Sequence, residues 1–184
     1  SHLSFVLLIA GVFCPLFRGR CSVVTQTVGG FAIVGLSVFP LQHVDLSGLV
    51  LGHVGVLSVS TIILLMQYLS CQSGLTNRRS EAENLILNVV WLLIGGVMYA
   101  STFGFFEVDT YALGYQPRMP WVVLAASGLA ALARHWLLAV CLATAVLAHQ
   151  WRLCESPNLW DCIIDPWLFF AAIFQLLWSA IHRK

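Results

Sequence analysis

Residues able to do chemistry are few in this chain, and most of its carboxylates fall between apolar runs. Among 184 residues there are eight Asp or Glu, nine Lys or Arg, six His and six Cys. Carboxylates from several loops can bind a hard cation, provided that the fold brings them together. We expect six of the eight on one outer face: Asp45, Glu107, Asp109, Glu155, Asp161 and Asp165. The plainer interpretation is that these residues simply populate loops that carry little positive charge.

Cysteine and histidine spacing gives no support for a bound metal or haem. Cys154 and Cys162 lie close in one predicted loop, where they could form a disulfide or remain two free thiols. The sequence contains neither a Cys-x-x-Cys redox pair nor zinc-ligand spacing. His135 and His149 would share a helix face but lie about 21 Å apart along it, too far to hold one haem. We therefore expect no metal and no cofactor.

Catalytic motifs are also missing from the sequence. Ser127 lies in an apolar run, but the Gly-x-Ser-Gly pattern and partner histidine of an intramembrane serine nucleophile are not evident. Every aspartate falls at the end of a predicted span, which does not suit an intramembrane aspartyl protease. There is no phosphate-binding Gly-x-x-x-x-Gly-Lys loop. We favour a non-catalytic protein and assign no catalytic residue.

The elements that must position these residues have the composition of a membrane protein. The chain is 59% hydrophobic and 9% charged, with a mean hydropathy of +0.87, whereas a soluble domain has roughly a quarter of its residues charged. Only helices and closed barrels satisfy their backbone groups in hydrocarbon. Runs such as 58–69 and 85–100 lack the alternation of barrel strands. We predict an all-α, polytopic transmembrane helix bundle with short loops, a single integral membrane domain over residues 1–184 and no soluble domain.

The apolar runs predict about seven spans. We place them at residues 3–17, 23–39, 46–69, 84–106, 121–133, 136–151 and 166–181. The first is treated as a span rather than a signal peptide, since no basic segment precedes it and no small-residue cleavage site follows it. Residues 121–151 as one helix would be about 45 Å long, against a hydrocarbon core of about 30 Å. We therefore place a hairpin tip at Arg134, with one span through Arg134, six in all, as the alternative.

Charge predicts how the bundle is oriented. With the hairpin, all but two of the nine basic residues share one side, and Arg118 and Arg152 lie on the other. A single span through Arg134 would weaken this bias. By the positive-inside rule the N-terminus is then outside and the C-terminus is cytoplasmic. We expect an integral membrane protein of a bacterial inner membrane.

Small and amide residues predict close helix contacts. Gly48 and Gly52 form a Gly-x-x-x-Gly step, which places Gly52 at a tight contact within the monomer or in an oligomer. Gln67, Asn84 and Asn88 could hydrogen-bond across the loop that joins their helices, or line a polar path.

The outer loops are where we expect function. Residues 107–120 and 154–166 are rich in Trp, Tyr and Pro, and we predict that they pack together as an ordered cap. Asp161 and Asp165 would share a face of one helical turn and accept from Arg118 or Arg152. The candidate outer surface comprises His43, Asp45, Glu107, Asp109, Arg118, Arg152, Trp160, Asp161 and Asp165.

We predict a small polytopic inner-membrane protein that acts as a non-catalytic subunit or accessory of an envelope membrane assembly. Its expected partners are the lipid bilayer and a protein partner or a second copy of the chain, not nucleic acid. A transporter or channel for a small solute or ion is the first alternative, and it would need a polar cavity at mid-membrane. A membrane enzyme acting on a lipid-linked substrate at the outer interface is the second, and it would need carboxylates that converge on a cleft.

Overall fold

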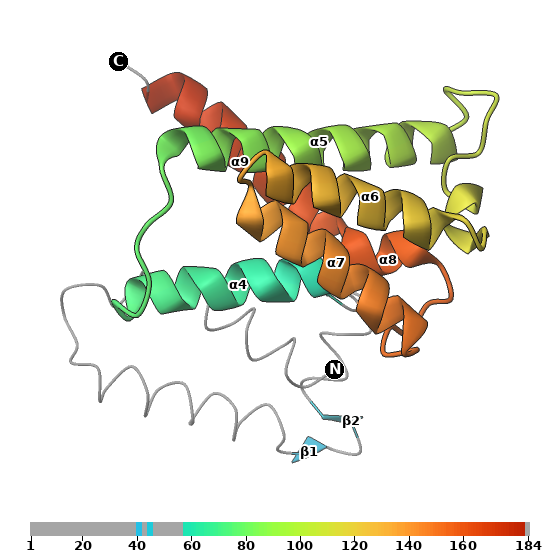
Figure 1. The fold of residues 1–184 in the computed structure, drawn as a ribbon, viewed down its shortest axis with the longest axis horizontal. Coiled ribbons are helices and arrows are strands. Elements are labelled where there is room, and N and C mark those ends of the chain that lie inside the picture. The colour runs from blue at the N-terminus through green and yellow to red at the C-terminus, as the bar shows by residue number, and fades with distance from the viewer. Residues whose placement is uncertain (1–39, 42–43, 46–56, 183–184) are drawn as a thin grey trace. The chain divides into compact units, whose positions relative to one another are not determined.

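The computed structural model describes residues 40–41, 44–45 and 57–182, and this part of the chain is almost entirely helical (Figure 1). Two short strands, β1 (Pro40–Leu41) and β2 (Val44–Asp45), pair antiparallel with Leu41 opposite Val44. The helices are α4 (Val59–Gln72), α5 (Glu81–Thr102), the 3-10 helix η2 (Ala112–Tyr115), α6 (Met119–Leu132), α7 (Trp136–Gln150), α8 (Leu159–Ile163) and α9 (Pro166–His182). The predicted all-helical class is confirmed for the described residues, apart from this one strand pair.

One described helix, α5 with 22 residues, is long and apolar enough to cross a membrane. The other apolar helices, α4, α6, α7 and α9, have 14 to 17 residues. They are therefore about 21 to 26 Å long, shorter than a hydrocarbon core of about 30 Å. The count of seven spans stays a prediction, and the spans placed at 3–17 and 23–39 lie outside the described residues, as does Gly52.

The chain divides into two compact units, one of Ser58–Thr61 with Arg79–Lys184 and the other of Ser1–Leu57 with Ile62–Arg78. The first turn of α4 thus belongs with the helices that follow. All of the residues that form the candidate site below lie in this larger unit.

Helices α6 and α7 form a hairpin with Arg134 at its tip (Figure 1). Arg134 has a φ of 63°, and its N–H and that of His135 donate back to the carbonyls of Ala131 and Ala130. These are the two hydrogen bonds of a Schellman helix end, a motif in which glycine usually occupies the left-handed position. The predicted tip at Arg134 is confirmed, and the alternative of one helix through this residue is wrong.

Helix α7 ends in the same way at Arg152, whose φ is 55°. Its N–H donates to the carbonyl of His149, and that of Leu153 donates to Ala148. Helix α5 ends with the same pair of bonds at Gly104, where φ is 78°. Two of these helix ends therefore place arginine in a conformation that normally selects glycine.

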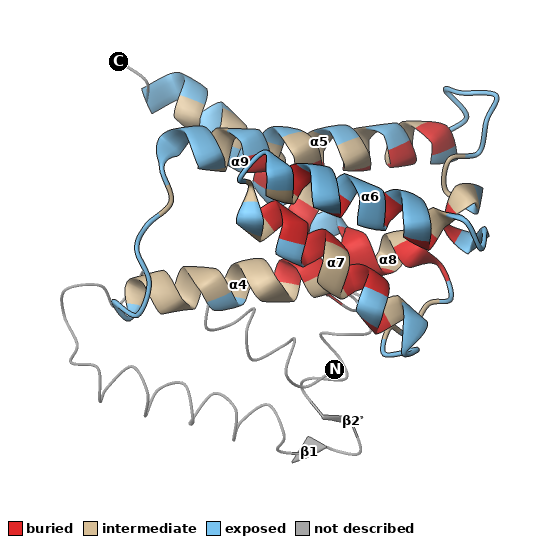
Figure 2. Ribbon diagram, viewed as in Figure 1, coloured by how far each residue is buried: buried red, intermediate tan, exposed pale blue. Residues whose placement is uncertain are grey.

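Side chains on α6 and α7 that face each other bury the centre of the hairpin. Figure 2 shows buried residues gathered on α7 and α8. Cys141 and Ala145 are fully buried on α7, and Ser127 of α6 donates from its hydroxyl to the carbonyl of Ala139 at 2.8 Å. Ser127 is thus a cross-helix hydrogen-bond donor.

Helices α5 and α9 also pack closely. Helix α5 begins with a capping box, in which Ser80 and Glu83 each accept from the other's backbone N–H. A Cβ atom on Gly95 would lie 2.5 Å from Cδ2 of Phe169, so the two helices can approach this closely only at a glycine. The Asn88 amide donates to Oε1 of Gln175 on α9 at 3.0 Å. Asn88 thus finds a partner on α9, and the predicted hydrogen bonding of Gln67, Asn84 and Asn88 across the loop stays a prediction.

Candidate functional site

The cap consists of residues 107–120 and 154–166, which connect α5 to α6 and α7 to α9 (Figure 1). The first segment contains η2 and the second contains α8, and these two short helices contact each other. The predicted packing of one segment on the other is confirmed.

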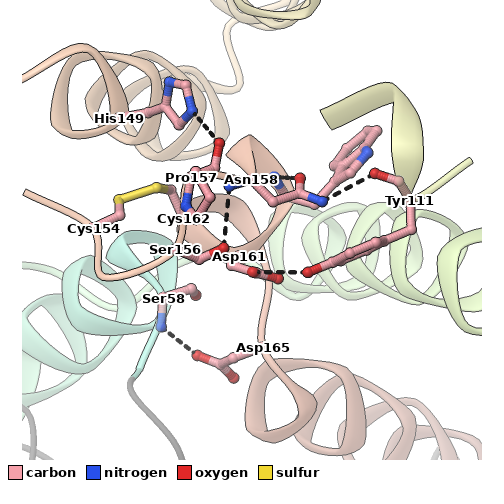
Figure 3. The surroundings of a disulfide bond; sticks show 11 residues. Ser58, Tyr111, His149, Cys154, Ser156, Pro157, Asn158, Asp161, Cys162 and Asp165 are labelled. Atoms are coloured by element: carbon pink, nitrogen blue, oxygen red, sulfur yellow. Dashed lines mark hydrogen bonds between the residues drawn. A yellow bond between two sulfur atoms is a disulfide. The ribbon is translucent and has the colours of Figure 1, made fainter. Parts of the chain in front are cut away.

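Three hydrogen bonds join the two segments. The indole N–H of Trp160 donates to the carbonyl of Thr110 at 3.0 Å, and the Asn158 amide donates to the carbonyl of Tyr111 at 3.0 Å. In the opposite direction, the Tyr111 hydroxyl donates to Oδ2 of Asp161 at 2.9 Å (Figure 3). Burial of the Tyr111 ring, followed by this hydrogen bond, raises the pKa of the hydroxyl well above its ordinary value.

The Asn158 side chain hydrogen-bonds to both segments of the cap. Its side-chain oxygen accepts from the N–H of Trp160 at 3.0 Å and so caps the N-terminus of α8, while its amide nitrogen reaches Tyr111. The side chain is fully buried, and Gly114 of η2 lies directly against it. A Cβ atom on Gly114 would overlap the Asn158 amide, so glycine is required there.

A disulfide links Cys154 to Cys162, with their Cα atoms 6.0 Å apart. The bond closes a ring of residues 154–162 (Figure 3), and Cys162 is buried within it. His149, in the last turn of α7, donates from Nε2 to the carbonyl of Pro157 at 3.0 Å. Of the two alternatives for these cysteines, the structure shows the bridge.

Asp165 is buried and joins two helix N-termini. Its Oδ2 atom accepts from the Ser58 N–H at 2.7 Å and from the Thr61 hydroxyl at 2.6 Å. Its Oδ1 atom accepts from the N–H of Leu168 at 2.7 Å, which caps α9 ahead of Pro166. One carboxylate therefore faces the positive ends of α4 and α9, where a negative charge is stabilised.

The predicted pairing of Asp161 and Asp165 with an arginine is wrong. Helix α8 ends at Ile163, and Ile164 is extended with φ of −139°, so the two carboxylates do not share one helical face. The Tyr111 hydroxyl donates to Asp161, and backbone and hydroxyl groups donate to Asp165. Arg118 and Arg152 are exposed, at the start of α6 and the end of α7.

Of the other predicted residues, Glu107 and Asp109 of the cap take no part in the three hydrogen bonds that join its segments. Glu107 and Asp109 are exposed, and Oδ1 of Asp109 accepts from the N–H groups of Tyr111 and Ala112 at the start of η2. Asp45 lies in β2, and His43 lies outside the described residues. Among the residues that the structure describes, no group of three His, Cys, Asp or Glu side chains could hold a metal ion.

Sequence reasoning missed Asn158 and Gly114. Asn158 directly precedes the apolar turn of α8, where an N-cap residue is expected, so its type and position were a usable signal. Gly114 gave a weaker signal. A single glycine indicates that another group packs closely against the backbone there, but it does not identify that group.

The chain matches no protein-family model, no curated protein and no solved structure.

Proposed function

We propose that this chain is a multi-pass integral membrane protein that serves as a non-catalytic subunit or accessory of a membrane assembly, with the cap as its contact surface. The observation that supports the membrane assignment is the surface of α6 and α9. Each of the following large apolar residues on these helices has more than half of its surface exposed: Trp121, Val122, Leu129, Leu132, Phe170, Phe174, Leu177, Trp178 and Ile181. Water solvates such surfaces poorly, whereas lipid tails cover them without cost.

The ends of the hairpin carry the residue types found at membrane interfaces. Trp121 and Trp151 are exposed at the cap end, and Arg134 and Trp136 are exposed at the tip. Interfacial rings and a long arginine side chain let a short helix cross a bilayer that thins locally. This supports the proposal that α6 and α7 are two separate spans beside α5, as a seven-span bundle requires.

The non-catalytic role is supported by how the polar groups of the cap are used. Asp161, Asp165 and Asn158 each accept hydrogen bonds that hold the cap or cap a helix. A general acid or nucleophile needs a group that substrate can reach, and these groups are engaged with the protein itself. Within the described helices, the amides of Asn88 and Gln175 are likewise bonded to each other. A transporter that used this amide pair would first have to break that bond.

Membrane integration is tested by washing membranes with alkaline carbonate and then extracting them with a mild detergent. The proposal expects the chain to stay with the membrane in carbonate and to leave it in detergent. Release by carbonate alone would contradict the membrane assignment.

Participation in an assembly is tested by native electrophoresis of the detergent extract. The proposal expects a band of larger mass than the 20.3 kDa chain, which is lost in Tyr115→Ala, where an exposed cap side chain is removed. Trp136→Ala removes an even more exposed aromatic ring, at the hairpin tip, and is the control. A band at the mass of the single chain, or equal loss in both variants, would contradict the cap as the contact surface.

A further inference from the structure

All three hydrogen bonds that join the cap segments come from inside the disulfide ring. Asn158, Trp160 and Asp161 lie between Cys154 and Cys162 and reach Thr110 and Tyr111 of the other segment. A closed ring has fewer unfolded conformations than an open one, so the bridge lowers the entropy cost of placing these three side chains together. Oxidation of this cysteine pair therefore stabilises a cap whose hydrogen bonds can also form in the reduced chain.

The pairing is selective within the described part of the chain. Cys71 is a free thiol that contacts Thr76 and the carbonyl of Asn77, and Cys141 is a free thiol fully buried on α7. A protein disulfide of this kind persists in an oxidising compartment, whereas a reducing cytosol keeps such pairs as thiols. The bridged pair therefore indicates which end of the bundle meets the oxidising side.

We propose that Cys154 and Cys162 are a modification site for a dithiol–disulfide oxidoreductase of an extracytoplasmic compartment, and that the cap matures on that side of the membrane. The Cys154 thiolate attacks the enzyme disulfide and forms a mixed disulfide, releasing one enzyme thiolate. The Cys162 thiolate then attacks the Cys154 sulfur, and the second enzyme sulfur leaves as a thiolate. Two protein thiols are oxidised and one enzyme disulfide is reduced to a dithiol, with the two protons passing to the enzyme thiolates.

The order of attack follows from burial. Cys162 is 1% exposed, whereas Cys154 is partly exposed in the folded cap. The enzyme thus reaches Cys154 first, and Cys162 resolves the intermediate from within. The site of oxidation stands on the cysteine pair alone, while the side of the membrane rests on the proposed function.

The oxidation is tested on the full chain in membranes of the cells that express it. Free thiols are blocked with N-ethylmaleimide after acid quenching, disulfides are then reduced, and the new thiols are labelled with a mass-tagged maleimide. The proposal expects tags that appear only after reduction, two of which are lost in the Cys154→Ser/Cys162→Ser variant. Cys71→Ser is the matched control and should keep both tags. Absence of reduction-dependent tags in the unaltered chain would overturn the proposal.

The enzyme partner is tested with single variants. Cys162→Ser should accumulate a reducible adduct to a dithiol oxidoreductase through Cys154, at several times the level seen with Cys154→Ser. Equal adducts, or no adduct in either variant, would overturn the proposed order of attack.

The side of the membrane is tested in sealed right-side-out vesicles. After free thiols are blocked with N-ethylmaleimide in the intact vesicles, without acid, a membrane-impermeant phosphine should reduce the pair, so that both tags appear without detergent. Tags that appear only after permeabilisation would overturn the placement of the cap outside. If the chain were instead released by carbonate but still carried the two tags, the membrane assignment would fail and the oxidation site would stand.

Discussion

The hydroxyl of Tyr111 and the carboxylate of Asp161 form a hydrogen bond of 2.9 Å that links the two segments of the cap. The raised pKa of Tyr111 means that the folded cap favours the protonated phenol. The stabilisation is therefore fully present below the ordinary tyrosine pKa of about 10, and it is lost as the pH rises through the higher pKa of the folded state. The cap should be insensitive to this group at neutral pH and should weaken in strong alkali.

Tyr111→Phe should remove the donor and leave Asp161 without this partner, at a cost of about 1 to 2 kcal/mol in unfolding free energy. It should also reduce the alkaline loss of stability. Thermal unfolding in detergent at neutral pH and at high pH would measure both effects. Tyr68→Phe, in α4 and outside the cap, is the control. An unchanged melting temperature in Tyr111→Phe would contradict the role of this bond.

Asp165→Asn should lower the unfolding free energy by about 2 to 4 kcal/mol. It replaces a carboxylate that accepts hydrogen bonds at two helix N-termini, and it places an amide N–H donor beside backbone donors. The readouts are thermal unfolding and the rate of proteolysis. Asp109→Asn changes an exposed cap carboxylate that asparagine can replace as a capping acceptor, so it should change stability little. Equal effects of the two substitutions would argue against a special role for Asp165.

Gly114→Ala should disrupt the fit between η2 and Asn158, at a cost of about 1 to 3 kcal/mol through overpacking. Gly128→Ala on α6 is matched in chemistry but meets open space, so it should be neutral or stabilising by about 1 kcal/mol through helix propensity. Faster hydrogen exchange at Trp160 in Gly114→Ala alone would confirm the contact. The same response in both variants would refute it.

Arg134→Gly should raise the unfolding free energy by up to about 1 kcal/mol, because glycine adopts the left-handed conformation of the hairpin tip without a steric penalty. Gly104→Ala tests the converse at the end of α5 and should cost about 1 kcal/mol. Chemical denaturation in detergent measures both. A loss of stability in Arg134→Gly would instead show that the arginine charge outweighs the backbone strain.

Much of the helical layout could be predicted from the sequence, since length and charge alone place a break at Arg134. The backbone conformation that ends the helix could not be predicted. Glycine is the expected residue at a Schellman end, and in this chain Arg134 and Arg152 occupy that position. The C-terminal end of a helix carries partial negative charge, which stabilises a positive side chain. This is one physical reason for arginine at these two helix ends.

The cap was predictable in outline but not in its chemistry. The aromatic and proline content of the two segments predicted that they pack together, because such packing depends on composition more than on exact helix boundaries. The partners of Asp161 and Asp165 depend on where α8 ends, and a shift of two residues in that boundary separates the carboxylates. Gly114 and Asn158 meet across 44 positions of sequence in a contact that local pattern cannot reveal.

The carboxylate of Asp165 accepts from the N–H of Ser58, a residue 107 positions earlier in the chain. During synthesis the first turn of α4 must therefore wait, with its N-terminal donors lacking this partner, until Asp165 has left the ribosome. A chain stopped before Asp165 would leave the Ser58 N–H and the Thr61 hydroxyl without this acceptor. The same bond thus leaves the start of α4 unfinished until the segment that follows α8 has been made.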